Sequence, residues 1–155
     1  MYHMIVRRRI MKLFAAINAG DPAPVVRAFS DPAEHVMIGD HALGGRRVSR
    51  QAIAAWYDRM FRLLRDVRFD VVRIDISGPP WATVAIIEWH ETNSATDGVQ
   101  TSASGAHVVH LKWGRMTRLI ILTDTAKLKA TLARIADKGT TEAMALPITD
   151  APPWP

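Results

Sequence analysis

Two polar residues, His107 and Asp124, combine a side chain able to move protons with a place on or beside a predicted strand. His107 has the same strand parity as Val109 and Leu111, so its imidazole belongs to an apolar strand face. Because imidazole titrates near neutral pH, His107 is the best acid/base candidate in the chain. The alternative is a buried histidine whose hydrogen bonds are only structural.

Asp124 follows the last predicted strand and begins a helix predicted to end at Lys138. At that position its carboxylate would accept backbone N–H bonds as a helix cap. A role in proton transfer requires a desolvated carboxyl with a raised pKa, whereas capping hydrogen bonds lower the pKa. The sequence leaves both roles open.

The remaining histidines and carboxylates do not form an obvious constellation. His35, in a short strand predicted over 35–38, is expected at the mouth of a pocket. Glu88 and Glu91 point to opposite faces of one strand, and the pattern does not tell which face is concave. His107 and His110 also differ in parity, and the chain has no cysteine. We therefore expect no metal site and no cofactor.

Helices are predicted where apolar residues recur at spacings of three and four. The first carries such a stripe from Ile10 to Ile17, and a short second helix follows Pro22 and closes at Pro32. Ser49 caps a third helix. Its buried stripe consists of Ile53, Trp56, Met60, Leu63 and Leu64. Tyr57, next to Trp56, is expected at the rim of a pocket as a hydroxyl donor.

After Asp66 the apolar period changes to two, which predicts four long neighbouring strands. They cover residues 68–76, 81–93, 101–113 and 115–123. The chain is therefore predicted to be α+β, with a cone-shaped, curved, mixed or antiparallel sheet wrapped around the N-terminal helices. A small-molecule pocket would form at the open end of the cone.

Length and charge limit the possible classes of protein. The 155 residues predict one domain over 1–139 and a proline-rich C-terminal arm over 140–155, extended or disordered. The net charge is +5, but the basic residues are scattered, and Arg46 and Arg47 are expected as solvated loop charge, so we expect no nucleic-acid partner. No stretch is apolar enough for a signal peptide or a membrane span, so we expect a cytoplasmic protein without a membrane partner.

Four segments carry a resemblance to a known family. They are Phe14–Asp21, the Phe29-Ser-Asp-Pro segment, Gly45–Tyr57, and His107–Arg115 with Thr123-Asp124. Together they resemble the SnoaL-like branch of the nuclear transport factor 2-like (ketosteroid isomerase-like) superfamily over roughly residues 10 to 135. The resemblance implies a cone-shaped α+β barrel, usually dimeric, with an apolar pocket. The expected pocket residues are Leu13, Ile17, His35, Met37, Trp56, Tyr57, Met60, Val109, Leu119 and Ile121.

The resemblance does not fix one reaction, because the family motifs are only partly present. Leu13 and Met37 stand where ketosteroid isomerases have the tyrosine and the aspartate base, and His107 replaces their third-strand aspartate. Ile121 stands where limonene epoxide hydrolases have a carboxylate. Asp124 matches the acid/base aspartate of SnoaL-like cyclases.

We therefore expect a protein that binds an apolar or aromatic small molecule and acts on it as a cofactor-free isomerase, cyclase or lyase. His107 and Asp124 are the expected catalytic pair. The alternative is a non-catalytic ligand carrier or interaction module. The apolar residues on both faces of the second long strand, together with the resemblance, predict a homodimer through the sheet.

Overall fold

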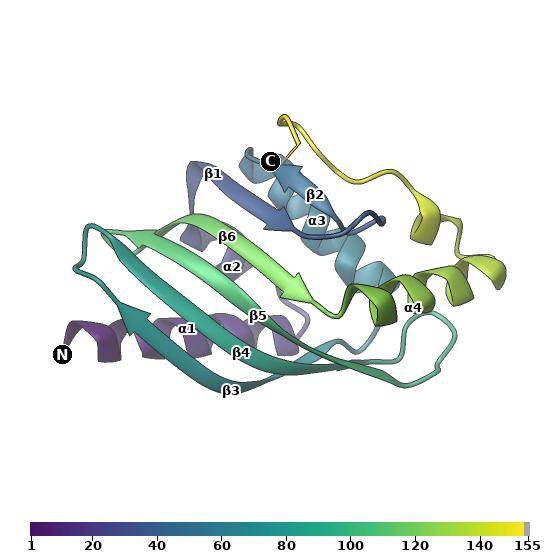
Figure 1. Cartoon of the computed structure of the whole chain (residues 1–155), viewed down its shortest axis with the longest axis horizontal. Helices are drawn as coiled ribbons and strands as arrows, with labels where there is room; N and C mark the ends of the chain where they lie inside the picture. The colour runs from purple at the N-terminus through teal and green to yellow at the C-terminus, as the bar shows by residue number, and fades with distance from the viewer. Residues whose placement is uncertain (154–155) are drawn as a thin grey trace.

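The computed structural model describes residues 1–153, which form a curved six-stranded sheet with helices packed against it. The helices are α1 (Tyr2–Asn18), α2 (Ala23–Ala28), α3 (Arg50–Leu63) and α4 (Thr125–Asp137), followed by the 3₁₀ helix η1 (Thr141–Met144). The strands are β1 (Phe29–Met37), β2 (Gly45–Arg47), β3 (Arg68–Ser77), β4 (Thr83–Asn93), β5 (Thr101–Lys112) and β6 (Arg115–Thr123). The predicted α+β class is confirmed (Figure 1).

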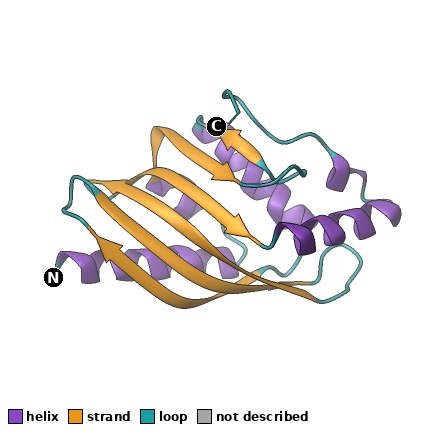
Figure 2. Ribbon diagram, viewed as in Figure 1, coloured by secondary structure: helices purple, strands orange, loops and turns teal. Residues whose placement is uncertain are grey.

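The strand order is β2-β1-β6-β5-β4-β3, and the pairing is antiparallel except between β1 and β6. In the view of Figure 2, α1, α2 and α3 lie behind the sheet, and α4 continues from the end of β6. The inward faces of the strands are mainly apolar, so the sheet and the helices share one core. That core includes the fully buried Ile53, Leu63, Ile87 and Ile135.

The largest differences from the expected boundaries lie at the start of the first helix and between the second helix and the first strand, which was expected over 35–38. The first helix begins at Tyr2 rather than Ile10, because Val6 extends the buried stripe and the Tyr2 hydroxyl pairs with Thr83 Oγ1 at 2.7 Å. The second helix ends at Ala28, and β1 begins at Phe29, whose carbonyl accepts hydrogen bonds from two arginine side chains. Tertiary contacts therefore decide both boundaries.

The C-terminal arm packs back onto the domain. Within it, the carboxylate of Glu142 in η1 forms ion pairs with Arg59 and Arg62. The carboxylate of Asp150 accepts hydrogen bonds from the backbone N–H groups of Val48 and Ser49. The arm is thus held against β2 and α3 as far as Pro152, whose carbonyl accepts from Arg46, and residues 154–155 lie outside the described residues.

The expectation of solvated loop charge is wrong for Arg47. Its side chain is fully buried, and its guanidinium donates to the Gly44 carbonyl at 2.7 Å and the Ile148 carbonyl at 2.8 Å. It also donates to His35 Nδ1 at 2.6 Å and lies 5.6 Å from the ring centre of Trp56. The half-buried Arg46 pairs with Glu34 at 3.0 Å. Neither arginine behaves as free loop charge.

Of the helices within residues 1–153, none combines the length and the apolar character needed to cross a bilayer.

Candidate functional site

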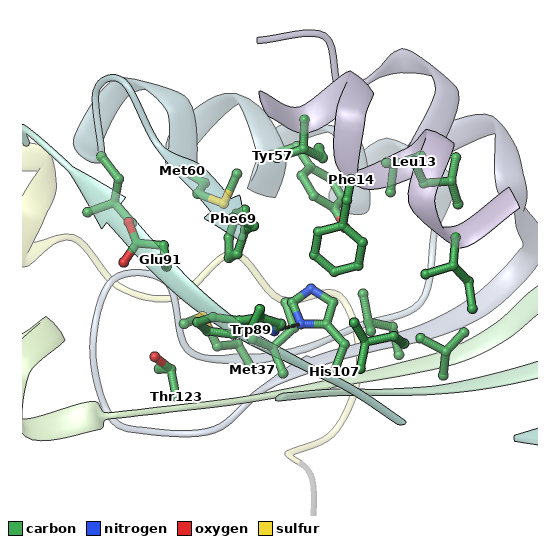
Figure 3. A pocket seen from close by; sticks show the side chains of 18 of the residues that line it. Leu13, Phe14, Met37, Tyr57, Met60, Phe69, Trp89, Glu91, His107 and Thr123 are labelled. Atoms are coloured by element: carbon green, nitrogen blue, oxygen red, sulfur yellow. Dashed lines mark hydrogen bonds between the residues drawn. The ribbon is translucent and has the colours of Figure 1, made fainter. Parts of the chain in front are cut away.

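A cavity of about 130 Å³ lies between the concave face of the sheet and helices α1 and α3 (Figure 3). Its wall is mainly apolar and aromatic, with a few polar groups between the apolar ones. The polar or aromatic-polar side chains on the wall include Tyr57, Trp89, Glu91, Asn93, Thr101, His107 and Thr123. A mostly apolar cavity with a few polar groups is the usual form of a small-molecule site.

The strand register places the wall residues in rows across the sheet. Met37 is next to Ile121, which is next to His107, which is next to Ile87. One step along, Thr123 and Gly105 are followed by Trp89 on β4. Because every second residue of β4 faces inward, Trp89 and Glu91 line the cavity while Glu88 and His90 are exposed on the other face. The concave face of β4, which the sequence left open, is therefore the face that carries Trp89 and Glu91.

His107 is a hydrogen-bond donor to the cavity. Trp89 Nε1–H donates to His107 Nδ1 at 2.7 Å, so the neutral ring must carry its own proton on Nε2. Burial lowers the pKa of His107 to about 3, which keeps the imidazole neutral near neutral pH. Phe14 lies 5.4 Å away, ring centre to ring centre, and a hydrogen bond with the Ala106 backbone offsets part of the effect of burial on the pKa of His107. His107 can therefore polarise an acceptor atom of a ligand, but its pKa is too low for an effective base.

Gly105 makes room for this arrangement. A Cβ at this position would lie 2.5 Å from Trp89 Cη2 and would also meet the carbonyl oxygen of Leu122. The bare backbone of β5 thus allows the indole of Trp89 to lie across the sheet toward His107. Phe69 packs edge-on against the same indole, with the ring centres 5.0 Å apart. The tautomer of His107 is therefore fixed by packing as well as by one hydrogen bond.

Glu91 is the carboxyl group on the cavity wall. It is 7% exposed, and its Oε1 accepts a hydrogen bond from Asn93 Nδ2 at 2.8 Å. No ion pair to Glu91 is formed within the described part of the chain, and burial raises its pKa to about 7. A carboxyl that titrates near neutral pH in a cavity can both accept and return a proton.

Glu91 is not among the site residues predicted from the sequence. The available signal was the run of polar residues Glu88, His90 and Thr92 on one face of β4, which marks that face as the solvated one. Ile86 and Val84 lie on the same face and are apolar, so the sequence pattern of the whole strand does not identify that face as the solvated one.

Two of the hydroxyl groups on the wall, those of Tyr57 and Thr101, are without a described hydrogen-bond partner. Tyr57 is buried, and burial raises its pKa, so its hydroxyl stays protonated. Its hydroxyl has no hydrogen-bond partner among residues 1–153. Thr101 is paired across β4 and β5 with Asn93, and its buried Oγ1 also lacks a described partner. Both hydroxyls are available to a ligand.

The predicted site residues do not all meet in the cavity. Nine of the ten predicted binding residues line it: Leu13, Ile17, Met37, Trp56, Tyr57, Met60, Val109, Leu119 and Ile121. His35 does not line the cavity: it is fully buried, and its Nδ1 accepts a hydrogen bond from Arg47. His107 is on the wall, but Asp124 is exposed and caps α4 by accepting from Lys127 N at 3.1 Å. The structure therefore does not bring His107 and Asp124 together.

No cluster of three histidine, aspartate or glutamate side chains able to hold a metal ion is present in the part of the chain that the structure describes.

Solved structures with the same fold are numerous. An NTF2-like protein of unknown function from Burkholderia pseudomallei K96243 has a TM-score of 0.73 at 16% identity, covering 81% of this chain and 95% of that chain. TerC, co-crystallised with polyporic acid, has a TM-score of 0.68 at 16% identity over 78% of this chain and 92% of that chain. A candidate SnoaL-like polyketide cyclase from Jannaschia sp. CCS1 has a TM-score of 0.67 at 10% identity over 81% and 90% of the two chains. These likenesses show the fold alone.

A comparison with curated proteins finds no significant match. The model of the SnoaL-like domain matches residues 10–119. This match covers most of the chain and includes helices α1, α2 and α3 and all six strands in whole or in part, from α1 to β6. With the α+β cone and its apolar cavity, it shows that the chain belongs to the family of SnoaL-like domains in the nuclear transport factor 2-like superfamily.

Proposed function

We propose that the cavity binds an elongated cyclic or aromatic ketone and that the protein catalyses a cofactor-free proton transfer on it. The observation that carries this proposal is Glu91, a buried carboxyl on the cavity wall with an amide partner and a pKa of about 7. A carboxyl in this state is suited to general acid/base catalysis. Glu91 takes the acid/base role that the sequence analysis gave to Asp124.

In the proposed reaction, the carboxylate of Glu91 removes a proton from a carbon conjugated with the carbonyl of the substrate. The electron pair of the C–H bond moves through the conjugated system onto the carbonyl oxygen. His107 Nε2–H donates a hydrogen bond to that oxygen as its negative charge develops. The carboxylic acid of Glu91 then returns the proton to another carbon, so the net result is isomerisation.

The spacing of the two groups supports a long substrate. In the register, His107 faces Ile87, and Glu91 is four residues further along β4, which is about 13 Å of strand. Trp89 lies between them and offers an aromatic surface to a flat ring system.

The second candidate function is a ligand carrier. It is favoured by Leu13 and Met37, apolar side chains at positions where the ketosteroid isomerases have catalytic groups. In a carrier, Glu91 and His107 would only bind polar atoms of the ligand.

A hydrogen-exchange experiment separates the two functions. Polyporic acid, steroid ketones and aromatic polyketide-like ketones would first be screened for thermal stabilisation of the protein. Compounds that bind would then be incubated with the protein in D₂O, and deuterium uptake at carbon would be followed by NMR.

We expect the wild-type protein to accelerate uptake into a bound ketone, and Glu91→Gln to slow it by about 100-fold or more while still binding. Glu88→Gln, on the exposed face of the same strand, serves as the matched control. Tight binding without any uptake would instead identify a carrier.

We also propose that the protein is a homodimer through the outer face of the sheet. Ile86 and Leu122 are 46% and 37% exposed on that face, beside Val108 and Ile120. Sedimentation is expected to give twice the monomer mass, and Ile86→Lys is expected to give the monomer. A wild-type protein that sediments as a monomer would contradict this proposal.

A further inference from the structure

One end of the molecule carries two exposed tryptophans. It is formed by the β3–β4 turn (residues 78–82), the β5–β6 turn (residues 113–114) and the first turns of α1. His3 Nε2 forms a hydrogen bond with the Gly78 carbonyl at 2.9 Å, and the backbone N–H of Trp113 donates to the Pro80 carbonyl at 2.7 Å. These bonds hold the three segments together beside the N-terminus (Figure 1), and we call this region the tryptophan end.

The tryptophan end exposes large apolar side chains. Trp81 and Trp113 are 57% and 66% exposed, with ring centres 5.8 Å apart. The first turns of α1 add the exposed Met1, Met4 and Ile5. Trp113 also has a left-handed backbone with φ of 51°, a conformation in which a large side chain is uncommon. A group of exposed apolar side chains at one end of a molecule usually marks an interaction surface.

The three stretches of chain that form the tryptophan end carry positively charged side chains and no negatively charged ones. Residues 1–20, 76–87 and 98–123 contain no aspartate or glutamate. Their exposed basic side chains are Arg7, Arg8, Arg9, Lys12, Lys112 and Arg115. Among residues 1–153, Arg8, Arg9, Lys12 and Lys112 form no ion pair. Asp31 is an exposed acid on β1, a strand that also begins at this end.

We propose that the tryptophan end docks on the surface of a bilayer containing anionic phospholipids. Tryptophan prefers the headgroup region because its ring is apolar and its N–H is polar. Unpaired lysine and arginine side chains are attracted to anionic headgroups. The exposed methionine and isoleucine side chains of α1 favour a lipid surface over a nucleic acid, since they offer bases no flat stacking partner.

A protein can dock on a membrane surface without a membrane-spanning segment. The expectation of no membrane partner rested on the lack of a spanning segment, so it does not argue against surface docking. Arg9 and Gly114 belong both to this end and to the cavity wall. Docking would therefore bring one end of the apolar cavity to the bilayer, where apolar compounds concentrate. The proposal is independent of whether the cavity is catalytic.

Vesicle co-sedimentation tests the proposal with the full chain. Vesicles of phosphatidylcholine alone would be compared with vesicles containing about one third phosphatidylglycerol. We expect binding only to the anionic vesicles, and we expect it to weaken as salt is added. The double variant Trp81→Ala/Trp113→Ala should bind about tenfold more weakly or worse, and Lys112→Gln about fivefold more weakly.

Matched controls lie elsewhere on the surface. Leu146→Ala removes an apolar side chain that is 86% exposed, and Lys129→Gln removes an exposed charge on α4. Both should bind vesicles like the wild type, and a thermal melt should show that all variants are folded.

Three results would overturn the proposal. The first is that wild-type protein fails to bind anionic vesicles or that the double tryptophan variant binds them equally well. The second is that a single-stranded oligonucleotide binds in a tryptophan-dependent way while vesicle binding is not affected by the tryptophans. The third is that the double variant lowers the sedimenting mass, which would make this end a contact between two copies of the chain.

Discussion

Two regions of the concave sheet face each hold a histidine against a tryptophan, but they differ in what surrounds the pair. In the middle of the sheet, His107 accepts from the Trp89 indole. At the corner formed by β1 and β2, His35 accepts from Arg47, and its ring centre is 4.5 Å from that of Trp56. Both neutral imidazoles therefore carry the proton on Nε2.

The surroundings of Nε2 separate the two regions. His35 Nε2 is buried and lacks a hydrogen-bond partner among residues 1–153, whereas His107 lies on the cavity wall. Burial and then the charge of Arg47 lower the pKa of His35 well below its ordinary value. The β1–β2 corner also anchors the C-terminal arm through Arg47. The same residue type in the same tautomer thus serves stability in one region and is available to a ligand in the other.

The largest expected effect concerns the corner. Arg47→Met removes three hydrogen bonds and leaves the Gly44 and Ile148 carbonyls without this donor, so we expect a loss of about 3 kcal/mol of unfolding free energy. Residues 145–153 should become sensitive to proteolysis. Denaturant unfolding and limited proteolysis measure both effects. Arg46→Met breaks a partly exposed ion pair and one exposed hydrogen bond to the Pro152 carbonyl, so it should cost about 1 kcal/mol or less. Equal losses of unfolding free energy in Arg46→Met and Arg47→Met would contradict this difference.

The next effect belongs to the cavity region and depends on pH. Because the pKa of Glu91 is raised from 4.5 to about 7, the unfolded chain ionises first as pH rises, and stability is lost between those two values. Glu91→Gln should therefore gain about 3 kcal/mol relative to the wild type at pH 8, with no such gain at pH 4. Chemical denaturation across this range measures the difference. A Glu91→Gln curve parallel to the wild-type curve would show that the carboxyl is not desolvated.

A smaller effect tests the tautomer of His107. Trp89→Phe removes the indole N–H but keeps a ring, so we expect a cost of about 1–2 kcal/mol and a mixed tautomer state of His107. The ¹⁵N shifts of the imidazole nitrogens report the tautomer by NMR. The shifts of His35 should stay unchanged, because its donor is Arg47. Unchanged His107 shifts would mean that the indole does not hold the ring.

The smallest effect concerns Asp124, outside both regions. Asp124→Ala removes the cap of α4 and should cost about 1 kcal/mol, whereas Asp124→Asn should be nearly neutral because asparagine also caps helices well. Thermal unfolding and ligand binding measure the outcome. If Asp124→Asn abolished exchange of a bound ketone while leaving stability intact, the acid/base role would return to Asp124.

The sequence by itself determined the elements and the side chains that share a face. Spacings of three and four identified the buried stripes of α1 and α3, and alternation placed His107 with Val109 on one face of β5. These patterns are local, since they depend on the 3.6-residue and two-residue periods of the backbone. Most of the predicted pocket residues line the cavity for this reason.

Only the tertiary structure decided which face of β4 is concave and which polar groups are buried. Ile86 and Ile87 lie on opposite faces, so hydrophobicity alone did not place Glu91 inside. The sequence predicts Arg47 as loop charge, whereas in the fold its guanidinium is buried and donates to the carbonyl of Ile148, 101 residues away. The pKa values of Glu91 and His107 and the tautomer of His107 likewise depend on desolvation and on donors brought from other parts of the chain. Residue types and periods do not contain this information, because burial is a property of the assembled fold.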